Sequence, residues 1–144
     1  MKINFKLFFI LVGLTVIFSS CRTSAPRLDY QALARASVLL GIDINLEDDH
    51  KLYLEAADWI GAPYRGGGDS KRGTDCSGMV YQIYRKVYRI QVPRNTEELK
   101  NKSNKVAKRN LKEGDLVFFS SNRSRKRVAH VGIYLKIGKF IHSS

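Results

Sequence analysis

The chain has 144 residues, which is enough for one domain and too few for two domains of ordinary size. Hydrophobic residues make up 44% and charged residues 26% of the chain, the composition of a soluble domain with a packed core. Its 25 basic residues exceed its 13 acidic residues and give a net charge of +12, which predicts an anionic partner and says nothing about the fold.

The start of the chain has the pattern of an export signal. Two lysines and no acid lead into residues 7–18, a mostly apolar run that is shorter than the roughly twenty apolar residues of a membrane-spanning helix. Two serines then precede Cys21, and this order resembles a bacterial lipoprotein signal, which is cut just before a lipid-bearing cysteine. We expect residues 1–20 to be the signal and residues 21–28 to be a lipidated tether. The alternative is an ordinary cleaved signal.

Two helices are predicted between the tether and a glycine-rich loop. Residues 29–41 begin at a candidate cap, Asp29, end at a glycine, and carry an apolar side formed by Leu33, Ala36, Val38, Leu39 and Leu40. Residues 51–61 also end at a glycine and have as candidate core residues Leu52, Leu54, Ala56, Trp59 and Ile60. The loop at residues 62–75 contains four glycines, and we expect it to lack regular structure and to bring backbone close to a ligand.

A third helix and a group of strands complete the pattern. Apolar side chains recur at spacings of three and four in residues 76–88, and Thr74 or Asp75 can cap this helix. A polar, basic stretch follows, with one expected helical turn from Thr96. Strand composition, rich in Val, Ile, Phe and Tyr, then appears at residues 115–120, 128–135 and 139–144. Helices followed by an antiparallel sheet predict an α+β fold.

Cys76 lies in the first turn of the third predicted helix, directly after the glycine-rich loop. Unpaired N–H groups and the helix dipole favour an anion at this position, and a thiolate is such an anion. A disulfide with Cys21 is not expected, because a lipidated Cys21 has no free thiol. An unpaired thiol outside the cytoplasm needs a reason, so we interpret Cys76 as a candidate nucleophile.

A nucleophilic thiol needs a base, and the chain has three histidines. His50 lies in the charged turn "EDDHK", which is typical of a solvated surface residue. His130 lies among strand residues, where a structural role is the alternative to a catalytic one. His142 lies on the next predicted strand.

The turn between the last two strands decides whether these two histidines share a face. A three-residue turn at residues 136–138 pairs position 135 with position 139 and places His142 diagonal to His130, within about 7–8 Å between backbone positions. A two-residue turn would put them on opposite faces. Glycine at the third position of the loop favours the three-residue turn, so we expect His142 beside His130, as a base with an orienting partner.

Five segments together resemble the NlpC-type cysteine peptidases of bacterial cell walls, which have a compact papain-like fold. In chain order they are "WIGAPYRGGGDSKRGTDCSGMV", "VPRNTEEL", "LKEGDLVFF", "HVGIYL" and "FIHSS". The resemblance implies a peptidase domain over residues 29–144 with its core motifs in residues 51–144. The family usually continues beyond its third polar residue, so the resemblance also implies that C-terminal strands are missing and that one sheet edge is unpaired.

The resemblance assigns three catalytic residues, with Cys76 as nucleophile, His130 as general base and acid, and His142 as the orienting residue. It implies that the hydroxyl of Tyr64 stabilises the oxyanion together with the backbone N–H of Cys76. Asp75 and Ser77 match positions that help to bind the free amine or polar groups of the stem peptide. No metal and no cofactor is implied.

The family cleaves peptidoglycan stem peptides, commonly between D-glutamate and a diamino acid, and we expect a peptidoglycan endopeptidase with a Cys-His-His mechanism. The expected partners are stem peptides and, through the lipid, a membrane of the cell envelope on its periplasmic or outer-membrane side. We expect a monomer and no nucleic acid. The ten basic and two acidic residues of the segment 100–127 predict either attraction to anionic envelope polymers or a solvated face.

Two other classes of function remain open at this stage. One is different cysteine chemistry on the same scaffold, either an amidase that cuts the sugar–peptide link or an acyl transferase. The other is a wall-binding lipoprotein that is inactive because it is truncated.

Overall fold

The structure, a computed structural model, describes residues 28–121 and 124–144. The expected signal and the expected lipidation site, Cys21, therefore lie outside the described residues. Within those residues, no helix combines the length and the apolarity that a membrane crossing requires.

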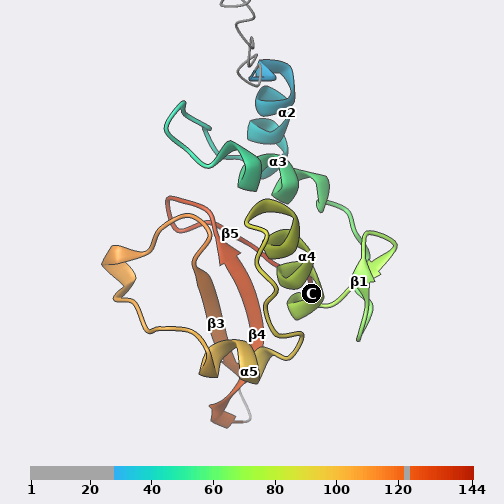
Figure 1. Cartoon of the computed structure of the whole chain (residues 1–144), viewed down its shortest axis with the longest axis vertical. Helices are drawn as coiled ribbons and strands as arrows, with labels where there is room; N and C mark the ends of the chain where they lie inside the picture. Colours follow the sequence, from blue (N-terminus) through green and yellow to red (C-terminus); the bar gives the residue numbers. More distant parts are fainter. Residues whose placement is uncertain (1–27, 122–123) are drawn as a thin grey trace, which may run out of the picture.

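Helices come first and the main sheet last, which confirms the expected α+β fold (Figure 1). The helices are α2 (Tyr30–Leu40), α3 (His50–Asp58), α4 (Cys76–Val87), α5 (Thr96–Asn101) and the short 3₁₀ helix η2 (Lys108–Asn110). The strands are β1 (Asp69–Ser70), β2 (Gly73–Thr74), β3 (Leu116–Ser121), β4 (Ser124–Tyr134) and β5 (Phe140–Ile141). The last three form one antiparallel sheet in the order β3-β4-β5, and β1 and β2 form a separate hairpin.

Side-chain caps explain where the first three helices begin. Asp29, Asp49 and Asp75 each accept a hydrogen bond from the amide N–H three residues further on, at 3.0, 3.1 and 2.7 Å. The expected caps at Asp29 and Asp75 are thus confirmed. α2 ends at Gly41, which is left-handed with φ 61°, as expected. α3 ends earlier than expected, because its last turn tightens when the N–H of Trp59 donates to the carbonyl of Ala56.

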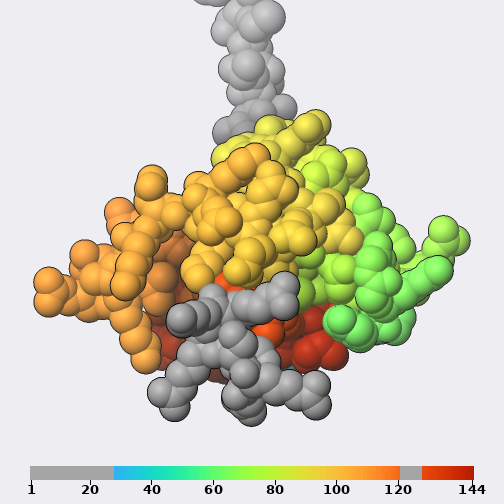
Figure 2. Space-filling view, turned by 90° about the horizontal axis from the view of Figure 1, so that it is seen from below, coloured from blue at the N-terminus to red at the C-terminus, as the bar shows by residue number. Residues whose placement is uncertain are grey.

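The expectation that residues 62–75 lack regular structure is wrong. The β1–β2 hairpin lies in this loop, and Tyr64 forms a parallel bridge with Thr74. Glycine makes this folding possible, because a Cβ at Gly68 would lie 2.4 Å from the carbonyl oxygen of Gly73. Figure 2 shows this loop, in light green, projecting on one side of the molecule and the basic segment after α5, in orange, projecting on the other.

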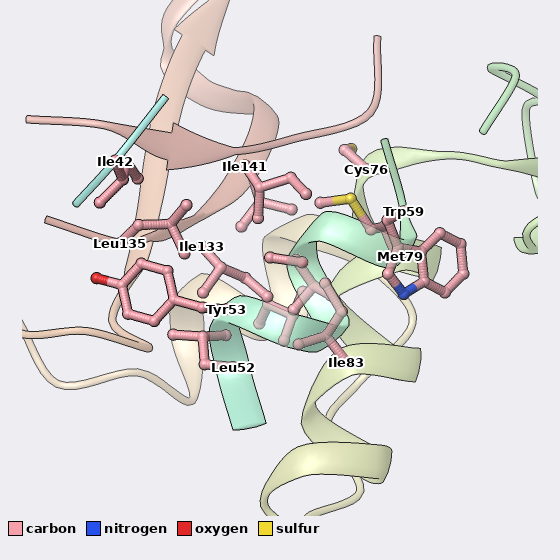
Figure 3. Packing of buried hydrophobic residues seen from close by; sticks show 14 residues of the cluster. Ile42, Leu52, Tyr53, Trp59, Cys76, Met79, Ile83, Ile133, Leu135 and Ile141 are labelled. Atoms are coloured by element: carbon pink, nitrogen blue, oxygen red, sulfur yellow. The ribbon is translucent and has the colours of Figure 1, made fainter. Parts of the chain in front are cut away.

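The core lies between the sheet and the helices α3 and α4. Its fully buried members include Leu52 on α3, Val80 and Ile83 on α4, and Val131 and Ile133 on β4. Figure 3 shows Cys76 beside Met79 and Trp59 at one end of this cluster. The apolar side expected for the first helix is only half right. Leu33 and Ala36 are buried, but Val38 and Leu39 are 82% and 57% exposed, since nothing in the described residues covers that side of α2.

The hairpin between β4 and β5 has the predicted register. Tyr134 pairs with Phe140 and Ile133 with Ile141, which continues the pairing of positions 135 and 139. Gly138 is left-handed, as expected, with φ 73°. Ile137 is also left-handed, with φ 54°, and its side chain is 81% exposed. This second strained position could not be predicted from the sequence, because β-branched residues rarely adopt a positive φ.

Replacement of Ile137 by glycine is expected to stabilise the domain by about 1 kcal/mol, because it relieves the left-handed strain and removes no buried side chain. Gly138→Ala is the matched change, since a Cβ there meets no atom within 4 Å and only adds strain. It should destabilise by about the same amount. Urea unfolding of both variants measures the free energy of unfolding, and a destabilised Ile137→Gly variant would contradict the strain.

Candidate active site

Cys76 is the first residue of α4 and is placed between a buried cluster and the next helix. Its side chain is part of the hydrophobic cluster and 9% exposed. Its Sγ lies 3.8 Å from Oγ1 of Thr96, the first residue of α5. The thiol forms no disulfide with any residue that the structure describes. Cys76 thus lies at a helix start, as predicted from the sequence. Its partial burial in the core was not predicted.

The first turn of α4 contains both paired and unpaired backbone donors. The amide N–H of Gly78 is taken by the carboxylate of Asp75, and the N–H of Met79 by the carbonyl of Asp75. Within residues 28–121 and 124–144, the N–H groups of Cys76 and Ser77 donate no hydrogen bond. Unpaired amides at a helix start are donors for an anion or an oxyanion.

Asp75 is the centre of a polar network. Besides capping α4, its carboxylate accepts a hydrogen bond from the N–H of Gly67 at 2.8 Å and one from the hydroxyl of Ser77 at 3.2 Å. The guanidinium of Arg94 lies 3.0 Å from the same carboxylate and also donates to Oγ of Ser77 at 3.0 Å. Partial burial by itself raises the pKa of Asp75, but the bond from Arg94 and the two backbone donors outweigh it and hold that pKa below its usual range.

Tyr64 and Ser143 meet the chain just before the thiol. The backbone of Tyr64 bridges to Thr74, while its side chain is 58% exposed. The hydroxyl of Ser143, which is buried, donates to the carbonyl of Thr74 at 2.9 Å. Because Ser143 follows His142 directly, this bond ties the end of the histidine strand to the segment that leads into Cys76.

His130 and His142 form a hydrogen-bonded pair, as the hairpin prediction required. Nε2 of His130 lies 2.9 Å from Nδ1 of His142, and the two rings are perpendicular at a centroid separation of 4.9 Å. The ring centroid of Phe119 lies 6.0 Å from that of His130, and the ring centroid of Phe140 lies 5.3 Å from that of His142. Burial lowers the pKa of His130, and the nearby charge of His142 lowers it further.

The thiol and the histidine pair belong to different environments. On β4 and β5 the core receives Val131, Ile133 and Ile141, so alternation places His130 and His142 on the other face. Among the described residues, no hydrogen bond joins Cys76 to either histidine. The structure therefore brings together the histidine pair and, separately, Cys76 with Asp75 and Ser77.

A groove of about 480 Å³ lies beside the histidine pair. Its lining includes His142 together with apolar residues from the ends of α2 and α3 and from the hairpin, among them Leu39, Ile60 and Phe140. Cys76 does not line this groove. In the part of the chain that the structure describes, no group of three His, Cys, Asp or Glu side chains could hold a metal ion.

Three contacts of the candidate site could not be predicted from the sequence. Arg94 and Thr96 lie in "VPRNTEEL", which drew attention as a motif without a role for either residue. A cation placed after a proline and before a helix was the only signal for Arg94. The bond from Ser143 to Thr74 joins residues 69 positions apart, and nothing in either local sequence indicates it.

The fold and the site define a small papain-like α+β domain that carries a thiol at a helix start and a histidine pair on its sheet. Residues 61–144 match the model of the NlpC/P60 family. The chain belongs to the NlpC/P60 family, which confirms the resemblance seen in its motifs.

Curated relatives agree with this assignment. The chain is 31% identical over 161 residues to a probable endopeptidase NlpC homolog of Haemophilus influenzae, covering 96% of this chain and 85% of the relative. It is 37% identical over 100 residues to the murein DD-endopeptidase MepS/murein LD-carboxypeptidase of Escherichia coli, covering 69% of this chain and 52% of that protein. It is 41% identical over 97 residues to the gamma-DL-glutamyl hydrolase of Bacillus subtilis, covering 67% of this chain and 23% of that protein. The chain thus spans most of the first relative, about half of the second and less than a quarter of the third.

Solved structures share the fold. The crystal structure of the NlpC/p60 domain of the peptidoglycan hydrolase SagA has a TM-score of 0.57 and 31% identity, over 69% of this chain and 80% of that one. An NlpC/P60 family protein from Bacillus cereus has a TM-score of 0.60 and 33% identity, over 69% of this chain and 32% of that one. The papain-like fold class is thereby confirmed. The family and these relatives support a peptidoglycan-hydrolysing peptidase.

Replacement of His142 by glutamine is expected to raise the pKa of His130, because the neutral amide removes the repulsive charge and can still form a hydrogen bond. Burial remains, so that pKa should stay below the ordinary value for histidine. An NMR pH titration of the imidazole protons measures the shift. His50→Gln, at the start of α3, is the control and should leave His130 unchanged. An unchanged titration in His142→Gln would show that the charge of His142 has no effect on His130.

Proposed function

We propose that this chain is a peptidoglycan endopeptidase that hydrolyses an amide bond of the stem peptide by cysteine chemistry. The observation that carries the proposal is the thiol of Cys76 at the start of α4, beside two amide N–H groups with no acceptor among the described residues. A nucleophile next to ready oxyanion donors is the arrangement that acyl transfer requires.

In the proposed mechanism, the sulfur of Cys76 attacks the carbonyl carbon of the scissile amide and forms a thioester. His130 takes the thiol proton and gives it to the departing amine, and water then hydrolyses the thioester with His130 again acting as base. The bond from Nε2 of His130 to His142 leaves Nδ1 of His130 for this proton. His142 orients the ring of His130, and the lowered pKa of His130 keeps the ring neutral and basic near pH 7.

The mechanism needs a hydrogen bond between Cys76 and His130. In the structure, the thiol instead contacts Thr96 and His130 contacts His142, so the two residues must come closer together. Such catalytic contacts often tighten only when substrate is bound. Tyr64 is the second proposed oxyanion donor, and its exposed side chain, on the bridge to Thr74, is accessible to a substrate. Asp75 and Ser77 are proposed to bind the amine end of the stem peptide, in competition with Arg94, which contacts both residues.

Two bonds are candidates for cleavage. The first is the bond between D-glutamate and the diamino acid, which the relative named gamma-DL-glutamyl hydrolase supports. The second is the bond of a DD-endopeptidase, which the name of the Escherichia coli relative MepS supports. An amidase and an acyl transferase give different products from both, so the products distinguish all four.

Purified muropeptides incubated with the chain should yield thiol-dependent fragments, and mass spectrometry should assign the cut to the D-glutamyl bond. In Cys76→Ser the rate of cleavage should fall at least about a thousandfold, because a hydroxyl in the same position is a much weaker nucleophile. Ser103→Ala, at the end of α5, is a control that removes a side-chain hydrogen bond away from the thiol. Equal cleavage by wild type and Cys76→Ser would refute cysteine catalysis, and a fragment released at a DD bond would favour the second candidate.

We also propose that residues 1–20 are removed on export and that lipid on Cys21 holds the domain at an envelope membrane as a monomer. The order of lysines, apolar run, serines and cysteine supports this proposal. Cells grown with radioactive palmitate should label the wild-type chain and not Cys21→Ser. Cys76→Ala, which removes the other thiol, is the control and should keep the label. Label that remains on Cys21→Ser would contradict lipidation at Cys21.

A further inference from the structure

A groove between α2, α3 and the end of α4 is lined by both apolar and basic side chains. The groove has a volume of about 630 Å³, and α2 and α3, which line it, lie at one end of the molecule (Figure 1). It shares Leu39 with the groove beside His142. Its apolar lining consists of Ala32, Ala36, Leu39, Leu54, Ala57 and Val87. Its cations are Arg35 on α2, Lys51 on α3, and Lys86 and Arg89 at the end of α4.

The lining also contains the acids Glu55 and Asp58, so its four cations exceed its acids by two. Lys86 is paired with Glu55 and lies 3.9 Å from Asp58. Arg35, Lys51 and Arg89 form no ion pair with any residue of the described segments. A neighbouring hollow of about 400 Å³ shares Lys86 and Arg89 and adds the cations Lys71 and Arg85 and the acid Asp69. Lys71 is paired with Asp58 and lies 3.9 Å from Glu55, whereas Arg85 forms no ion pair with a described residue. The two hollows together form a continuous basic strip.

α2 presents apolar side chains to solvent next to this strip. Val38 is 82%, Tyr30 69% and Leu39 57% exposed, and the helix contains no acidic residue. An exposed helix face of this kind marks a contact surface, because a solvated surface helix normally carries charged residues there. Apolar side chains beside unpaired lysines and arginines complement a surface of anionic headgroups over acyl chains.

We propose that the groove and the exposed face of α2 dock on an anionic phospholipid bilayer. The position of α2 favours a bilayer over a second protein, because α2 is the first described helix after residues 1–27, which contain the apolar run 7–18. The excess of cations favours anionic lipid over a second copy of this chain, whose matching face has the same charge.

This docking fixes the direction in which the thiol faces. The groove is lined by Val87 at the end of α4, and Cys76 is at the start of that helix. A helix of 12 residues is about 18 Å long, so Cys76 is held away from the docked surface. The domain would then stand on the bilayer with its thiol facing the wall rather than the lipid. The docking uses none of the proposed catalytic or substrate-binding residues, although Leu39 also lines the groove beside His142, and it does not require the proposed peptidase activity.

Binding of the full chain to vesicles of phosphatidylglycerol tests the charge requirement. Arg35→Glu/Lys51→Glu should weaken binding at least about tenfold, since each cation near an anionic surface contributes roughly a factor of five. Glutamate is well tolerated at both helical positions, and position 51 is in the first turn of α3. Lys105→Glu/Lys108→Glu, in the basic segment after α5, carries the same change in charge and should weaken binding less than about threefold. Equal losses in the two variants, or no loss in the first, would overturn the proposal.

Fluorescence quenching by brominated phosphatidylglycerol tests the place of contact. All variants keep residues 1–27, so any contact made by that segment is common to them. Leu39→Trp should be quenched and Val106→Trp, in the basic segment, should not, with wild type giving the background of Trp59. Quenching at neither or at both positions overturns the proposal, as does lipid-independent dimerisation that shields Leu39→Trp. Cys76→Ser should bind vesicles like wild type, so a failure of the peptidase and a failure of docking are separate results.

Discussion

Thr74 lies where three distant segments of the chain meet, and the candidate site is organised around its hydrogen bonds. The residue is fully buried. Its N–H donates to the carbonyl of Pro63, while its own carbonyl accepts from the N–H of Arg65 and from the hydroxyl of Ser143. These bonds fix the backbone two residues before Cys76. The buried carbonyl and N–H of Thr74 need hydrogen-bond partners. Residues of the glycine-rich loop and Ser143, after the last strand, supply these partners.

The site consists of two halves that are joined at this crossing. One half is the start of α4, where Asp75 caps the helix and is itself held by Arg94. The other is the β4–β5 hairpin, which holds His130 against His142. The bond from Ser143 to Thr74 connects them within two residues of the thiol and one residue of His142. The proposed approach of His130 to Cys76 would therefore leave the bond between Ser143 and Thr74 in place. The hydrophobic cluster holds α4 against β4.

The positive charge of the chain is divided among separate surfaces. The segment after α5 projects on one side of the molecule (Figure 2), and the basic groove lies between α2, α3 and the end of α4. The expected attraction to anionic envelope polymers can use the first surface, and the proposed docking uses the second. Val87 at the end of α4 lines the groove and Cys76 lies at the start of that helix, so the proposed docking and the proposed catalysis use different residues.

The sequence by itself determined the local features. Cap residues and glycines marked the start of α4 and the end of α2, and the turn at residues 136–138 determined that His142 lies beside His130. These follow from interactions within a few residues, so spacing alone reveals them. The tertiary structure decided what depends on contacts between distant segments. Val38 and Leu39 are exposed to solvent, and the glycine-rich loop forms a hairpin. Arg94 binds Asp75, and Ser143 binds Thr74. The two histidines lie on the face of the sheet away from the core. Such contacts depend on which elements pack together, and no single stretch of the sequence contains that information.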